Sequence, residues 1–72
     1  MRQYRNRLGV TQWMPSIEEM EELDREGEGW CLACGSTQPG VEPDARRYEC
    51  EACGAAKVYG PDELVAMGLI YG

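Results

Sequence analysis

Four cysteines carry the chemistry that this sequence can be expected to perform. They form two matching pairs, Cys31-Leu32-Ala33-Cys34-Gly35 and Cys50-Glu51-Ala52-Cys53-Gly54, and fifteen residues separate Cys34 from Cys50. Two C-x-x-C pairs separated by about 15 to 20 residues have the spacing of a tetrahedral zinc site. We therefore predict one bound Zn²⁺ ion with four protein ligands, which are Cys31, Cys34, Cys50 and Cys53.

A site of this composition is expected to be structural. Because the sequence contains no histidine, four thiolates would complete the tetrahedron and leave no coordination position for water or substrate. Gly35 and Gly54 follow the two pairs and suit the tight turns that let backbone N–H groups face the sulfurs. The sequence shows no Ser-His-Asp set, no phosphate loop and no acid/base pair with a pocket. We predict no catalytic residues and no enzymatic activity.

Two disulfides are the alternative use of the same cysteines, and they are typical of small secreted proteins. The basic residues 1–7 precede Leu8 to Gln12, which is not the apolar stretch of a signal peptide, and no small-residue cleavage site follows. No run approaches the about 20 apolar residues of a membrane span. The sequence favours metal ligation in a reduced, cytoplasmic protein that has no membrane partner.

The length of 72 residues predicts one domain that needs a metal to fold. A hydrophobic core in a chain this short rarely supplies more than about 3 to 5 kcal/mol, whereas structural zinc contributes about 10 to 16 kcal/mol at neutral pH. The sequence has no Phe, two Trp and four Tyr, so its core is small. We predict a single metal-stabilised domain over residues 16–72, preceded by a basic arm and extended segment over residues 1–15.

Local patterns place the elements around the cysteines. We expect residues 1–8 to be frayed and residues 10–14 to be extended, before the boundary at Pro15. Ser16 with Glu19 is a capping-box pattern and predicts a helix over 17–26, with an apolar stripe and an acidic opposite face. A second helix is predicted from Pro61 to Met67. Short strands are predicted at 30–32, 45–50 and 56–59, an irregular loop at 36–44, and an apolar tail at 69–71 that packs on the body or forms a contact.

These elements predict a small metal-stabilised α+β fold in which two C-x-x-C-G turns and short β-hairpins lie between an N-terminal and a C-terminal helix. The pattern Trp30-Cys31-x-x-Cys34-Gly35, a loop and then Tyr48-x-Cys50-x-x-Cys53-Gly54 resembles a zinc ribbon of the rubredoxin-like kind. Residues 40–50 with Val58-Tyr59-Gly60 resemble small stand-alone zinc-ribbon proteins of bacteria and phages. The resemblance implies the fold and the structural metal, and it leaves the activity open.

Two relatives of that fold suggest further functions. Zinc ribbons of transcription elongation factors carry paired acids at a hairpin tip, and the nearest candidates here are Glu42 and Asp44, for which solvated turn residues are the alternative. Rubredoxin itself transfers electrons through iron held by four thiolates. It commonly has proline after the first cysteine of the second pair, where this chain has Glu51, and its span between pairs is longer. An electron carrier is therefore a secondary hypothesis.

The net charge of −6 favours a protein partner over nucleic acid, because contacts with phosphates supply most of the affinity for nucleic acid. The charge is also segregated: residues 1–15 carry three Arg and no acid, whereas residues 16–30 carry seven acids and one Arg. We predict a protein–protein interaction module, with a regulatory or phage-encoded accessory role. The alternative is a nucleic-acid-binding, transcription-associated protein whose basic residues gather on one face: Arg2, Arg5, Arg7, Arg46, Arg47 and Lys57.

Overall fold

The structure is a computed structural model, and residues 2–71 are described from it. Over these residues the chain forms two antiparallel sheets and two helices. In chain order the elements are β1 (Arg2–Arg5), β2 (Thr11–Met14), α1 (Ile17–Glu26), β3 (Glu28–Cys31), β4 (Thr37–Pro39), β5 (Tyr48–Glu49), β6 (Ala56–Tyr59) and α2 (Pro61–Met67). The fold is therefore a small α+β arrangement with antiparallel sheets, as predicted.

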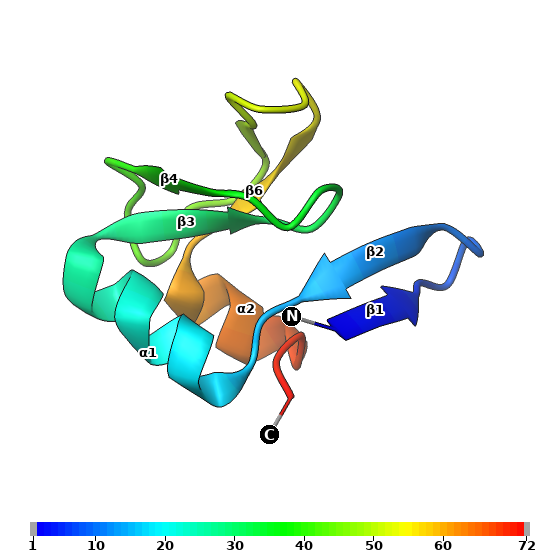
Figure 1. The fold of residues 1–72 in the computed structure, drawn as a ribbon, viewed down its shortest axis with the longest axis horizontal. Helices are drawn as coiled ribbons and strands as arrows, with labels where there is room; N and C mark the ends of the chain where they lie inside the picture. Colours follow the sequence, from blue (N-terminus) through cyan, green and yellow to red (C-terminus); the bar gives the residue numbers. More distant parts are fainter. Residues whose placement is uncertain (1, 72) are drawn as a thin grey trace.

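The two sheets differ in position and in size. Strands β1 and β2 form a hairpin of their own, and the second sheet has the strand order β4-β3-β6-β5. Both helices lie on one side of the four-stranded sheet, and the hairpin projects from the body of the molecule (Figure 1). Neither helix in the described part of the chain is long and apolar enough to cross a membrane.

The hairpin corrects the expectation of a frayed N-terminal arm over residues 1–8. Strand β1 pairs with β2 along its whole length, and β2 is the extended segment predicted before Pro15. In the connecting turn, Asn6 Oδ1 accepts hydrogen bonds from the backbone N–H groups of Leu8 at 2.9 Å and Val10 at 3.0 Å. Asparagine side chains commonly stabilise turns in this way, so the chain folds back and pairs the backbone of β1. Met1 lies outside the described residues.

The four-stranded sheet separates two groups of buried side chains. Trp30 of β3 lies opposite Tyr59 of β6, and Cys31 lies opposite Val58. Because successive side chains of a strand point to opposite faces, the first pair faces the helices and the second pair faces away from them. The helix-side core contains Leu23, Trp30, Leu32 and Leu64, with Trp13, Tyr59, Leu69 and Ile70 against it. The metal-side core contains Cys31, Val41, Ala45, Cys50 and Val58, with Cys34 against it.

Two expectations for this sheet were wrong in their extent. The loop predicted over 36–44 contains β4, which pairs with β3 so that Gln38 lies opposite Gly29. The strand predicted over 45–50 is reduced to β5, because Arg47 has a φ of 55° and the register to β6 shifts next to Tyr48. Strand β4 forms because residues 37–39 pair with the distant strand β3. Strand β5 is short because Arg47 adopts a left-handed conformation just before it.

Helix α1 begins and ends where the sequence predicts. The Ser16 hydroxyl accepts from the Glu19 backbone N–H at 3.1 Å, and the Glu19 carboxylate accepts from the Ser16 N–H at 2.9 Å. This capping box satisfies two backbone donors that a helix start leaves open. Gly27 forms the C-cap, and Leu23 is buried against the sheet while the acidic side chains face outward.

Helix α2 spans the predicted residues, and the apolar tail after it packs on the body. Leu69 and Ile70 lie against the helix-side core. The backbone of Tyr71 forms a bridge with the start of α1, since it accepts from Ile17 N–H at 2.8 Å and donates to the Pro15 carbonyl at 3.1 Å. The tail is thus part of the fold, and its contacts close the molecule around the two helices.

Candidate metal centre

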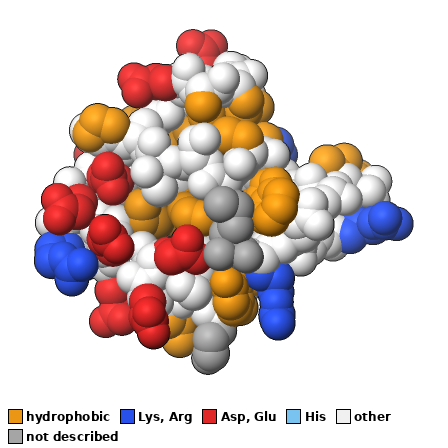
Figure 2. Space-filling view, in the orientation of Figure 1, with side chains coloured by type: hydrophobic (Ala, Val, Ile, Leu, Met, Phe, Trp, Pro, Cys, Tyr) orange, Lys and Arg blue, Asp and Glu red, His pale blue; other side chains and the backbone are white. Residues whose placement is uncertain are grey.

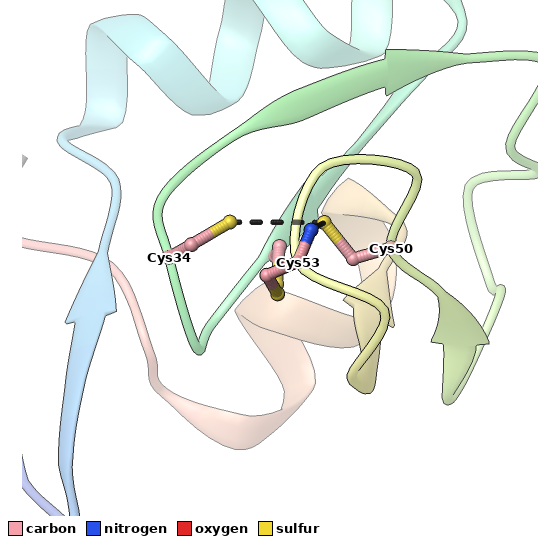
Figure 3. A group of neighbouring side chains, drawn as sticks. Cys34, Cys50 and Cys53 are labelled. Atoms are coloured by element: carbon pink, nitrogen blue, oxygen red, sulfur yellow. Dashed lines mark hydrogen bonds between the residues drawn. The ribbon is translucent and has the colours of Figure 1, made fainter.

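The four cysteine sulfurs converge on one point between two turns of the chain. Cys31 ends β3 and Cys34 lies in the turn that follows, while Cys50 follows β5 and Cys53 lies in the turn before β6. All four Sγ atoms lie within 4.8 Å of one another. The cysteines are free, and two of them, Cys31 and Cys50, are buried. Figure 3 shows the sulfur of Cys50 facing that of Cys34. All four residues predicted as metal ligands are brought together.

The four sulfurs lie close enough together to hold one metal ion. The Sγ atoms of Cys31 and Cys53 are 3.7 Å apart, and so are those of Cys34 and Cys50. In a regular tetrahedron with Zn–S bonds of about 2.3 Å, the edge between two sulfurs is about 3.8 Å. A disulfide would bring two sulfurs to about 2.05 Å. These two edges therefore suit a shared metal ion and exclude a disulfide between either pair, and each joins one cysteine from each turn.

The two cysteine turns share one backbone arrangement. The N–H of Gly35 donates to the Cys31 carbonyl and that of Gly54 to the Cys50 carbonyl, both at 2.8 Å. Gly35 and Gly54 have φ values of 78° and 77°, a conformation that side chains disfavour. The first cysteine of each turn also donates its N–H to the carbonyl five residues later, at 2.9 Å in both cases. The repeated C-x-x-C-G sequence thus produces two equivalent turns, which face each other across the cluster.

Backbone donors and burial act in opposite directions on the two buried sulfurs. Burial raises the pKa of the Cys31 thiol to about 12. The backbone N–H groups of Cys53 and Ala52, which lie 3.4 Å and 3.3 Å from the Cys50 sulfur, lower the pKa of Cys50 to about 6. The surroundings therefore favour the thiolate at Cys50 and the thiol at Cys31, and a metal ion that binds Cys31 would have to displace its proton.

We expect zinc binding to release protons and the apparent affinity to increase with pH. The metal-free protein holds more protons than the zinc-bound form, so raising the pH favours the bound form. Cys31 and Cys53, whose pKa values are raised, lose their protons on binding throughout the range, and Cys50 releases a further proton below about pH 6, where the dependence becomes steeper. Calorimetry in two buffers of different ionisation enthalpy counts the protons. An affinity that is constant from pH 5 to 8 would contradict this assignment.

Gln38 supports the second cysteine turn and was not recognised in the sequence. Its side chain accepts from the Glu51 backbone N–H at 3.0 Å and donates to the Glu49 carbonyl at 3.2 Å. The residue therefore holds the chain on both sides of Cys50. Only the register of β4 on β3 brings Gln38 to this position, and no local sequence pattern predicts β4. The pairing of β4 with β3 thus brings Gln38 to the cysteine site, and the C-x-x-C-G motif itself does not include this residue.

We expect Gln38→Ala to weaken zinc binding about tenfold, because groups that orient metal ligands typically contribute a factor of about 10 to 100 in affinity. The ligands themselves remain, so the protein still folds with zinc. Competition with a chromophoric chelator measures the change, and Gln3→Ala, at an exposed position of β1, is the matched control. Equal zinc affinity in the two variants would show that Gln38 does not position the turn.

The paired acids considered for a transcription-factor-like tip are used differently. The Glu42 carboxylate accepts a hydrogen bond from the Tyr48 hydroxyl, and this bond lowers the pKa of Glu42. Asp44 is exposed. Between them, the Pro43 carbonyl accepts from the N–H groups of Asp62 at 2.9 Å and Glu63 at 3.3 Å. The loop therefore caps the start of α2, which has no side-chain cap of its own.

The basic residues of the nucleic-acid alternative are distributed over two sheets. Arg2 and Arg5 belong to the hairpin, whereas Lys57 lies in β6 of the four-stranded sheet. Arg46 forms an ion pair with Glu63 of α2 at 3.0 Å. Arg47 lies just before β5 and has a left-handed backbone conformation. The hairpin is thus a basic surface separate from the other basic residues.

A small hollow lies between α1 and the edge of the four-stranded sheet, and no sequence pattern indicated it. Its volume is about 160 Å³, and it is lined by Glu19, Glu22, Leu23, Glu28, Trp30 and Thr37. Leu23 and Trp30 are buried, and Glu22 is exposed. The hollow therefore combines an apolar base with carboxylates beside it.

Comparisons of the chain with protein-family models, with curated proteins and with solved structures found no match.

Proposed function

We propose that the chain is a structural zinc protein of the zinc-ribbon kind, without enzymatic activity, that acts as a binding module for a protein partner. The observation that carries this proposal is the cluster of four sulfurs within 4.8 Å between two equivalent turns. Four thiolates complete the coordination of zinc, and such closed sites serve to stabilise folds.

The acidic face of α1 supports a basic protein segment as the ligand. Five acidic side chains of this helix are exposed: Glu18, Glu21, Glu22, Asp24 and Glu26. Figure 2 shows acidic side chains spread over the body of the molecule on the side of this helix. The hollow beside α1 has Leu23 and Trp30 at its base. A lysine or arginine side chain matches this combination, because it has an apolar stem and a cationic end.

A lysine-rich decapeptide tests the proposed surface directly. We expect the zinc-loaded protein to bind this peptide, and the variant Glu18→Gln/Glu22→Gln/Glu26→Gln to lose binding. The matched control is Asp44→Asn/Glu49→Gln/Glu51→Gln, which removes the same charge from exposed positions outside α1. Retained binding in the α1 variant, or equal loss in both variants, would count against α1 as the binding face. Leu69 of the apolar tail packs against the helix-side core, so its substitution would test the fold and not the binding surface.

Electron transfer through iron is the second candidate, since four thiolates also bind iron. Metal analysis and the absorption spectrum of the purified protein separate the two candidates. Zinc gives a colourless protein, whereas ferric thiolate absorbs in the visible range. We expect one zinc ion per chain and no visible absorption, and a red, iron-containing protein would replace the proposed structural role with a redox one.

A further inference from the structure

The hairpin of β1, β2 and the turn over residues 6–10 differs in charge from the rest of the molecule. It carries Arg2, Arg5 and Arg7, all exposed, and no acidic residue. The remaining chain holds all thirteen acids. Figure 2 shows basic side chains on the projecting part of the molecule that Figure 1 identifies as the hairpin, and acidic ones on the body. The fold therefore separates a positive projection from a negative body.

The hairpin arginines are available to an external anion. Within the described residues, neither Arg5 nor Arg7 forms an ion pair, and the pair that is formed joins Arg46 to Glu63. Arg2 lies over the ring of Tyr71, at 4.9 Å from the ring centre. The hairpin projects from the body that carries the acids (Figure 1), and charges are screened over about 10 Å at 0.1 M salt.

The tip of the hairpin also exposes aliphatic side chains. Leu8 is 84% exposed and Val10 is 53% exposed. The polar side chains of Gln3 and Thr11 are exposed along the strands, close to Arg5, which lies opposite Thr11. Cations, hydrogen-bonding groups and an apolar tip thus share one two-stranded ribbon.

We propose that this hairpin binds duplex DNA as a β-ribbon, independently of the partner proposed for α1. A groove of about 12 Å, the width of the major groove, accepts a two-stranded ribbon. Arg5 and Arg7 contact phosphates at the edges of the groove, and Leu8 at the tip contacts thymine methyl groups, which are the apolar feature of the major groove. Gln3 and Thr11 supply hydrogen bonds to the duplex.

Fluorescence anisotropy with a 20-base-pair duplex and the zinc-loaded chain tests the proposal. Two to three phosphate contacts give a slope of about −1.8 to −2.7 in a plot of log K against log salt. Affinity should therefore fall about ten- to fortyfold between 50 and 200 mM salt. Arg5→Gln/Arg7→Gln should weaken binding at 50 mM salt at least tenfold and remove most of the slope. Leu8→Ser should weaken binding and leave the slope unchanged.

The control variant is Arg25→Gln/Arg47→Gln, which changes the net charge equally at exposed positions outside the hairpin. It should bind the duplex like the unaltered protein. The proposal is overturned by absent binding at low salt, by equal loss in the two double variants, or by binding to phosphatidylserine vesicles with none to DNA. The altered side chains are exposed, so zinc content and the amide spectrum should be the same in all variants. The DNA-binding results do not depend on α1, so they test the hairpin even if the protein does not bind the lysine-rich peptide.

Discussion

Replacing Cys31 by serine is expected to abolish stable zinc binding and to unfold the chain. Structural zinc contributes about 10 to 16 kcal/mol in small domains, whereas a core of this size supplies about 3 to 5 kcal/mol. Cys31 is fully buried and belongs to the metal-side core, so serine removes both a ligand and a packed side chain. Circular dichroism with and without zinc measures the loss, and a chelator should have the same effect on the unaltered protein.

Ala33→Ser is the matched control, because it introduces the same side chain at an exposed position of the same turn. This variant should bind zinc and fold like the unaltered protein. If the chelated protein kept its native amide spectrum, the metal would not be what holds the fold together. In that case the two cores alone would account for the stability of the molecule.

Gly60→Ala is expected to destabilise the zinc-bound protein by about 3 kcal/mol or more, at the upper end of the range for overpacking. A Cβ atom on Gly60 would overlap the carbonyl oxygens of Glu42 and Pro43. These are backbone atoms, and the Pro43 carbonyl caps α2 by accepting from Asp62 and Glu63. The loop can therefore not move away without losing that cap. Denaturant unfolding at constant free zinc measures the change.

Gly40→Ala provides the comparison for this prediction. Gly40 has a φ of 73°, and a Cβ atom there would contact nothing within 4 Å. Alanine at Gly40 should cost about 1 to 2 kcal/mol through backbone strain alone. Gly60 has the ordinary φ of −77°, so its cost comes from overlap alone. Equal effects at both positions would mean that the loop adapts to a side chain at Gly60.

The loop over residues 42–45 shows where prediction from sequence was incomplete. Its acids and proline indicated a turn, and paired acids in such a loop resembled a functional tip. In the structure, Pro43 caps α2 and Gly60 donates its N–H to the Ala45 carbonyl at 3.0 Å. These contacts join residues about 15 to 20 positions apart. No pattern within the loop specifies them, because each partner is an ordinary backbone group.

The sequence by itself predicted the cluster of four cysteines and both helices, because these depend on short-range chemistry. The C-x-x-C-G repeat specifies its own turns, Ser16 with Glu19 caps α1, and Pro61 begins α2. Only the tertiary structure decided that Gln38 supports one of the turns and that the basic N-terminal segment is a hairpin. Strands of two to four residues carry little periodicity, so their pairing depends on partners that become neighbours only when the chain folds.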